Sequence, residues 1–402
     1  MVKRFSILYV LIPALWLVSC MTGEAGNKAK DPGIYTDEDF DRLGITDPDH
    51  LSAASIRALQ WGKKDSDWFI EFEEFDLEGD LAYEDGVVRR DPSAILKIDD
   101  LFYVWYSRST GPTQGFSGDI EVDKVFPWDR CDIWYATSED GLSWKEEGMA
   151  VPRGPEGAYD DRSVFTVEVM QWEGRYYLCY QCIKSPYAVR AKNQVGLAWS
   201  DSPRGPWTKT DEPILSPADN GVWKGEEDNR FQVLKKGDFD SHKVHDPCIV
   251  PYKNKFYLYY KGEQMGEEIT FGGRQIRHGV AIADQATGPY VKSPYNPISN
   301  SGHEICVWPY QNGIASLITT DGPEKNTIQW SPDGINFEIQ SVIKGAPHAI
   351  GLNRSADNEA EPTEILRWGL THRYMNGDYQ YIRGFRSRRI IRHVAKGEDD
   401  RP

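Results

Sequence analysis

Three acidic residues occupy matching positions in a stretch of sequence that repeats along the chain. Asp91, Asp246 and Glu304 each stand at the opening of a short apolar segment that is followed by a turn and an aromatic segment. Carboxyl groups that lie close together raise one another's pKa, and apolar walls raise it further. One group of such a set then serves as a base and another as an acid, which glycoside hydrolysis needs. A single Asp-Pro pair could instead be a turn with a capping Asp, but three matched positions favour a common site.

Two histidines directly precede members of this set. His245 stands before Asp246, and His303 stands before Glu304. Histidine has the side chain whose pKa is closest to neutral, so it can give or take a proton at pH 7. A lone histidine is usually a hydrogen-bonded filler, but matched positions in two repeats predict that both histidines line the site.

Five other residues are candidates for binding a sugar. Thr166 and Glu168 alternate along one strand and therefore face one side, and Gln181 ends the neighbouring strand. Trp128 and Arg130 end a long loop, where the indole could stack on a sugar ring and the guanidinium could bind hydroxyls or a carboxylate. The alternative for Trp128 is that it packs the loop down.

The carboxylates belong to a repeat of two phrases in a fixed order. The first phrase is an apolar strand, a turn and an aromatic strand; the second is a strand of small residues, a Gly turn and an aromatic residue, as in 134–144 and 197–207. Five such units, the last beginning at Ala349, predict an all-β fold: a five-bladed β-propeller whose innermost strands line a central channel. A sandwich array is the alternative, but it does not explain the fixed order.

Composition agrees with this interpretation. The 402 residues include 14 Trp, 21 Tyr and 15 Phe, with 36 Gly and 24 Pro, a mixture that favours strands and turns over helices. Hydrophobic residues make up 40%, which excludes wholesale disorder. The net charge of −16 argues against a nucleic-acid partner, since such proteins present a basic face.

The chain begins like a secreted lipoprotein. Lys3 and Arg4 precede a mostly apolar run, 5–18, that is shorter than the roughly 20 residues of a membrane span. Residues 17–20 look like a bacterial lipoprotein box, which implies a signal peptide over 1–19 and a lipid on Cys20; a plain signal peptide is the alternative. Residues 20–32 have the composition of a tether. We expect a protein anchored by its lipid at the periplasmic or outer-membrane surface of a Gram-negative bacterium.

Five further cysteines follow: Cys131, Cys179, Cys182, Cys248 and Cys306. Cys179 and Cys182 have the CxxC spacing of redox and zinc sites. In a strand, however, these two side chains point to opposite faces, and no second pair completes a zinc set. We therefore predict buried free thiols.

The segment before the repeats has a helical pattern. Residues 36–39 could cap one helix and 49–61 forms a second, while 62–85 is acidic and loop-like. We therefore divide the chain into a helical N-terminal segment with its loop over 33–85, a propeller over 86–393 and a tail over 394–402.

Four motifs stand in order along residues 33–390: Ser52-Ala-Ala-Ser-Ile-Arg57, Asp91-Pro-Ser, Val244-His-Asp-Pro247 and Gly302-His-Glu-Ile-Cys306. Together they resemble glycoside hydrolase family 117, the α-1,3-L-neoagarooligosaccharide hydrolases (neoagarobiases) of agar-degrading bacteria. The first motif matches the family's SxAxxR pattern in a helix-turn-helix-like segment. The resemblance implies that this segment exchanges between the subunits of a homodimer.

The resemblance also implies an exo-acting, inverting hydrolase that releases 3,6-anhydro-L-galactose from the non-reducing end of neoagaro-oligosaccharides. In that mechanism Asp91 is the general base, Asp246 tunes pKa and orients the site, and His303 is the general acid with Glu304 in support. Whether His303 or Glu304 donates the proton stays open. No cofactor is required. Some members hold a structural cation in the channel, but no cluster here has ligand spacing that demands one.

Other functions are also open. A related propeller glycosidase could act on arabinofuranosides, xylosides or another algal galactan, although the His303-Glu304 pair and the SxAxxR segment argue against the plant-pentose families. Absence of the three matched carboxylates would favour a surface lipoprotein that only binds glycans, yet all three are present. A structural dimerisation module is a further alternative. A phosphorylase would need a phosphate site, which no basic cluster indicates.

Overall fold

The computed structural model describes residues 37–42, 46, 49, 51, 59, 68–266, 277–320, 322–343, 345–354, 362–375 and 379–389. The chain divides into two compact units, residues 1–59 and 60–402. In the first unit a helix, α1 (Asp37–Arg42), lies in the segment that was expected to be helical. The signal peptide 1–19, Cys20, the tether 20–32, the motif Ser52–Arg57 and the tail 394–402 lie outside the described residues. No helix of the described residues is long and apolar enough to cross a membrane.

The first sheet unit of the larger part carries Asp91. Its strands are β3 (Val87–Arg90), β4 (Leu96–Ile98), β5 (Leu101–Thr110), β6 (Asp132–Ser138) and β7 (Ser143–Val151), with β2 (Glu78–Gly79) at the edge. Both β3 and β4 pair with β5, so they act as one inner strand that is interrupted between Arg90 and Leu96. A 3₁₀ turn, Gly115–Ser117, lies in the loop after β5.

The second and third sheet units follow the same order. They are β8 (Ser163–Trp172), β9 (Arg175–Ile183), β10 (Asn193–Ser200) and β11 (Thr208–Lys209), and then β14 (Lys243–Tyr252), β15 (Lys255–Glu263), β16 (Arg277–Ala283) and β17 (Val291–Lys292). A hairpin of β12 (Val222–Trp223) and β13 (Val233–Lys235) stands between them.

Two further sheet units follow along the chain. They are β18 (Val307–Tyr310), β19 (Gly313–Ile318), β20 (Thr327–Ser331) and β21 (Glu338–Val342), and then β22 (Gly351–Leu352), β23 (Trp368–Met375), β24 (Tyr379–Arg389) and β1 (Ile70–Asp76). A 3₁₀ turn, Glu364–Leu366, precedes β23. The first strand of this part of the chain, β1, is thus the outer strand of the last sheet, beside β24.

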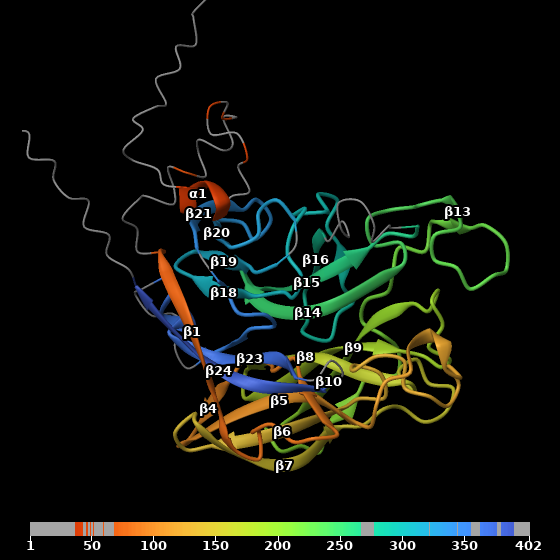
Figure 1. The fold of residues 1–402 in the computed structure, drawn as a ribbon, viewed down its shortest axis with the longest axis horizontal. Helices are drawn as coiled ribbons and strands as arrows, with labels where there is room; N and C mark the ends of the chain where they lie inside the picture. The colour runs from red at the N-terminus through yellow and green to blue at the C-terminus, as the bar shows by residue number, and fades with distance from the viewer. Residues whose placement is uncertain are drawn as a thin grey trace, which may run out of the picture. The chain divides into compact units, whose positions relative to one another are not determined.

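The sheet units succeed one another around a common centre (Figure 1). The inner strand β8 contacts both β5 and β14, β14 contacts β18, and β24 contacts β3. This arrangement is a β-propeller, so the predicted all-β fold class is confirmed. The repeats predict five blades, and the number of blades stays a prediction.

One predicted boundary is wrong. The propeller was expected to begin at residue 86, after an acidic loop, but β1 spans Ile70–Asp76 and pairs along its whole length with β24. Two acidic residues of β1 have basic partners on the last two strands: Glu74 is 2.7 Å from Arg373 of β23, and Asp76 is 2.9 Å from Arg383 of β24. The charges that stabilise this strand lie some 300 residues away in the sequence. Taken alone, the segment therefore has the acidic composition of a loop.

The core is built from the aromatic strands that the repeats predicted. Trp105, Trp144 and Trp308 are among the largest fully buried side chains. The five described cysteines are free and buried, as predicted. The aromatic residues therefore serve mainly as packing between sheets, and few of them are available for binding sugar.

A buried ion pair holds the long loop between β5 and β6 against the start of β8. The guanidinium of Arg162 lies 2.7 Å and 2.6 Å from the two carboxylate oxygens of Asp129, and both side chains are almost fully buried. The same guanidinium donates to the backbone carbonyls of Ile120 and Asp123, each at 2.7 Å. One side chain therefore anchors a loop that has little regular structure of its own.

We expect Asp129→Ala to lower the free energy of unfolding by about 3–5 kcal/mol, because it leaves a buried guanidinium without its counter-ion. Urea titration followed by tryptophan fluorescence measures this loss. The matched control is Asp201→Ala, which removes a carboxylate that pairs with Arg175 at the exposed surface and should change stability little. Equal effects of the two substitutions would contradict the assigned role of the buried pair.

Candidate active site

The inner strands share an unusual backbone conformation at one end of the channel. Residues at the equivalent position of four sheet units have left-handed backbone angles: Asp91 (φ 49°), Thr166 (46°), Asp246 (51°) and Ala349 (45°). In the fourth sheet unit Gly302, two residues before Glu304, has φ 99°. The β8–β9 and β14–β15 ladders are each interrupted at this point. Left-handed non-glycine residues are uncommon and costly, and they gather at functional sites.

These interruptions direct side chains from separate sheet units into one cavity. Its polar lining consists of Asp91, Thr166, Glu168, Asp246 and Glu304, and its apolar lining of Pro92, Val167, Pro247, Ile305, Ala349 and Ile350. The three carboxylates that the repeats matched therefore meet. The cavity measures about 30 Å³, which is space for water but too little for a sugar ring. A ligand the size of a sugar ring would therefore lie above these oxygens.

Asp91 is held as a buried carboxylate. Arg90 is 2.9 Å from each of its oxygens, and the hydroxyl of Thr166 donates to Oδ2 at 3.0 Å. Its backbone N–H donates to Nδ1 of His372 at 3.1 Å. Burial alone would raise the pKa of Asp91, but Arg90, His372 and Thr166 outweigh burial and hold it well below its usual range. Asp91 is thus ionised at neutral pH.

Asp246 and Glu304 form a second charged group around a buried lysine. The ammonium of Lys261 contacts Oδ2 of Asp246, and Nε2 of His303 lies 3.8 Å from Oε1 of Glu304. Burial and the charge of Glu304 raise the pKa of Asp246 despite Lys261. Burial also acts to raise the pKa of Glu304, but His303 and Lys261 prevail and lower it. The two carboxyls are therefore tuned in opposite directions.

The turn that carries His303 rests on another histidine. A Cβ on Gly302 would come within 2.4 Å of Cε1 of His278, so only glycine fits there. His278 is buried and hydrogen-bonds to the backbone of His303. The side chain of His303 itself is 27% exposed, which leaves it open to a ligand above the cavity.

The remaining predicted residues divide into two groups. His245 is buried between Gln181, 3.4 Å away, and Glu263, 3.6 Å away, and neither His245 nor Gln181 lines the cavity. Glu168 does line it, but its carboxylate accepts the backbone N–H of Ala94 at 3.1 Å, a bond between two sheet units. These three residues hold inner strands in place.

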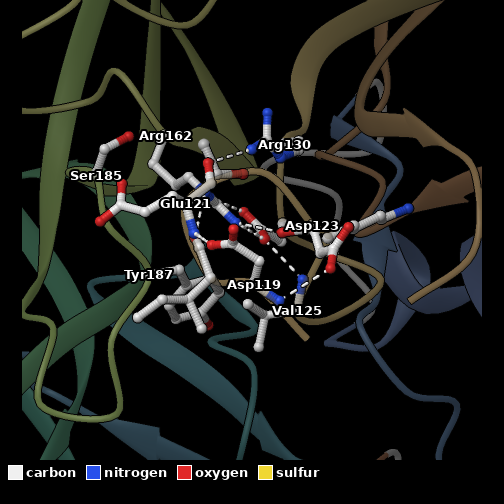
Figure 2. Close-up of polar contacts among 12 residues, drawn as sticks. Asp119, Glu121, Asp123, Val125, Arg130, Arg162, Ser185 and Tyr187 are labelled. Carbon is white, nitrogen blue, oxygen red and sulfur yellow. Dashed lines mark hydrogen bonds and ion pairs between the residues drawn. The ribbon is translucent and has the colours of Figure 1, made fainter. Parts of the chain in front are cut away.

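The loop residues lie farther from the cavity. Trp128 stacks on Phe126 with ring centroids 4.6 Å apart, donates its indole N–H to Tyr187, and lies 4.9 Å from the guanidinium carbon of Arg90. These contacts favour the packing alternative for Trp128. Arg130 donates to the carbonyl of Glu121 within the same loop (Figure 2), and neither Trp128 nor Arg130 lines the cavity.

Four residues that support the site were not predicted: Arg90, Lys261 and His372 beside the acidic groups, and His278 beside the turn of His303. Arg90 adjoins Asp91, so its position was a usable signal. The other three come from β15, β16 and β23, and none stands beside a candidate residue in the sequence. Their role depends on which strands lie next to the channel, which no short motif records.

The residues present do not fit a metal ion at the cavity. The oxygens of Asp91 already bind Arg90 and Thr166, and Asp246 is paired with Lys261. Within the described ranges, no group of three or more His, Cys, Asp or Glu side chains is arranged to hold a metal.

Two buried histidines predict a pH dependence of stability. Burial is the main cause that lowers the pKa of both His242 and His278 to about 3. The next cause is the charge of a nearby lysine, which is Lys243 for His242 and Lys261 for His278. In the unfolded chain both take up a proton below roughly pH 6.5. The stability that their neutral form supports is therefore complete above pH 6.5 and is lost as pH falls toward 3, by up to about 1.4 kcal/mol per pH unit for each histidine.

Urea unfolding at several values between pH 7 and 5 tests this. We expect a shallower slope of stability against pH for His242→Gln and for His278→Gln than for the wild type. The slope is the readout, because either substitution can also lower stability uniformly. Parallel slopes in all three proteins would show that the histidines are protonated in the folded state.

Comparison with known proteins connects this geometry to a family. No family model and no curated protein matches the chain. Among solved structures, a family 117 glycoside hydrolase produced by the marine bacterium Zobellia galactanivorans is 32% identical, with a TM-score of 0.65, and the match covers 80% of this chain and 92% of that one. A second glycoside hydrolase, 14% identical with a TM-score of 0.54 over 86% and 98% of the two chains, shares the fold. The identity and coverage of the first match show that the chain belongs to glycoside hydrolase family 117.

Proposed function

We propose that the protein is an exo-acting, inverting hydrolase of α-1,3 linkages at the non-reducing end of neoagaro-oligosaccharides, releasing 3,6-anhydro-L-galactose. The observation that carries the proposal is the meeting of Asp91, Asp246 and Glu304, from three sheet units, in one cavity. Hydrolysis of a glycosidic bond needs one group to deprotonate water and another to protonate the leaving oxygen. Asp91, which Arg90, His372 and Thr166 hold ionised, suits the first of these two roles.

Asp91 is the proposed general base. Its carboxylate is ionised and lines a cavity with room for water, so a water molecule there can give its proton to Asp91 while its oxygen attacks the anomeric carbon of a sugar above. The contacts with Arg90 and Thr166 fix the orientation of the carboxylate, which keeps the water aligned with the bond that breaks.

His303 is the proposed general acid. Glu304 is held as a carboxylate, so it has no proton to donate at neutral pH. Asp246 has a raised pKa but is buried against Lys261. His303 is the exposed proton carrier at this edge, and Glu304 stands beside it as the negative partner. In this scheme Asp246 and Lys261 tune the charge around the pair.

Product analysis tests the proposed function. The purified protein is incubated with neoagarobiose and neoagarotetraose, and in parallel with aryl arabinofuranosides, aryl xylosides and other galactan oligosaccharides. We expect release of 3,6-anhydro-L-galactose from both, leaving D-galactose from neoagarobiose and a trisaccharide from neoagarotetraose, with the first-formed anomer inverted in proton NMR spectra. Release of sugar from an arabinoside alone would replace the substrate assignment. A retained anomer would exclude the inverting mechanism, and no product from any glycan would leave a binding protein.

A further inference from the structure

Two hollows lie at the end of the inner strands opposite the carboxylate cavity. Along β8 the cavity residue Thr166 and the residue Trp172 are six positions apart, and along β14 the same holds for Asp246 and Tyr252. Six residues of strand span roughly 20 Å. The hollows measure about 420 and 370 Å³, within the range of ligand sites. Both are lined by Trp172 and Pro251, so they adjoin. We call them together the distal groove.

Aromatic rings form the wall of the distal groove, and contacts with neighbouring residues fix the orientation of these rings. Trp172 is 37% exposed, and its ring meets that of Phe256 edge to face, with centroids 5.6 Å apart. Tyr252 packs edge to face on Tyr257 at 5.5 Å, and its hydroxyl lies 2.6 Å from the carbonyl oxygen of Asn312. An exposed ring in a fixed orientation offers a flat apolar surface at little cost in conformational entropy.

The charges around the distal groove balance. Lys255 and Asp284 pair with each other, and the other charged lining residues are Glu173 and Arg354. Two acidic and two basic side chains leave no net charge to attract a phosphate, a sulfate or a basic peptide. Asn254 and Gln285 add neutral amides to the lining. Flat apolar rings beside neutral hydrogen-bonding groups match the two sides of a sugar: its C–H face and its hydroxyls.

We propose that the distal groove is a second, non-catalytic binding site for a neutral oligosaccharide. It lies at the far end of the strands that carry the carboxylates, so it would hold a neighbouring stretch of polysaccharide and keep the enzyme close to its substrate. The choice of agar-type oligosaccharide as ligand rests on the proposed function, whereas the class of ligand rests on the groove itself.

The binding test uses the full protein with Asp91→Asn, which slows cleavage, and compares it with the same protein carrying Trp172→Ala as well. The probes are neoagarohexaose, an arabinan oligosaccharide and a xylan oligosaccharide, followed by isothermal titration and by saturation-transfer NMR. We expect a class of binding sites that weakens about tenfold or more with Trp172→Ala. The matched control is Trp199→Ala, which removes a tryptophan of the same sheet unit that lies under Arg175.

Trp172→Phe and a thermal unfolding scan separate loss of binding from loss of fold, since phenylalanine keeps an aromatic face. With active protein, Trp172→Ala should leave turnover of a disaccharide unchanged and slow the attack on polysaccharide. Binding of an arabinan or xylan oligosaccharide that depends on Trp172 would keep the groove and reject the agar assignment. Equal affinity with and without Trp172 for every probe, or binding of none outside the cavity, would overturn the proposal.

Discussion

Asp91→Asn is expected to reduce kcat on the cleaved oligosaccharide by about 10²–10⁴-fold, because the amide cannot take a proton from water. The substitution keeps the size of the side chain, so KM should change much less than kcat. Initial rates of release of the terminal sugar measure both constants. Asp99→Asn is the matched control: Asp99 also has a left-handed backbone (φ 53°), but it lies in an exposed turn, and its replacement should leave the rate unchanged.

Azide distinguishes a base from a residue that only shapes the site. Azide is a nucleophile that needs no deprotonation, so it should restore turnover of Asp91→Asn, with formation of a glycosyl azide of inverted configuration. The glycosyl azide would be identified by mass spectrometry and NMR. Activity of Asp91→Asn within tenfold of the wild type would place the base on another residue. A lost activity that azide does not restore would make Asp91 a positioning residue.

His303→Ala and Glu304→Gln should respond differently to the leaving group of the substrate. Without its general acid the enzyme must expel an unprotonated oxygen, so we expect His303→Ala to lose about 10²–10⁴-fold in kcat on the natural linkage. An aryl glycoside with an acidic phenol departs without a proton, so its loss should be less than tenfold. Glu304→Gln should show a weaker dependence on the leaving group, with a smaller loss than His303→Ala on the natural linkage, because it acts through His303.

The comparison of the two substrates decides between the histidine and the carboxylate. Glu304 would be the acid if the loss of kcat in Glu304→Gln depended on the leaving group while His303→Ala slowed both substrates equally. This result would also mean that the carboxylate is protonated in the complex with substrate, against the direction set by His303 and Lys261 in the free protein. Circular dichroism of both variants checks that the turn at Gly302 remains folded.

The meeting of the carboxylates was predictable because it follows from repetition. Asp91, Asp246 and Glu304 stand at the same position of similar units, and equivalent positions in a radial array point to the same centre. The roles of Gln181 and His245 were less predictable. Polar residues on inner strands suggested contact with sugar, but the structure joins these two side chains to each other and His245 to Glu263.

Contacts between distant residues explain most of what was missed. His372 reaches Asp91 across 281 positions of sequence. Lys261 meets Asp246 because β14 and β15 are neighbours whose ladder is interrupted beside Asp246. Such an interruption shifts which residues lie opposite one another, and the regular alternation of a strand does not reveal where it occurs.

The amino-acid sequence by itself determined the repeating units, the strand pattern of each unit and the acidic residues at the head of the inner strands. Those features are local, because alternation along a strand and turn residues between strands act over a few positions. The tertiary structure alone decided that the acidic segment Ile70–Asp76 is the outer strand of the last sheet, and which cations hold each carboxylate. Both depend on closing the ring of sheets. Only closure brings the basic residues of β24 to β1, and His372 to Asp91, where their charges and hydrogen bonds stabilise what local sequence leaves undecided.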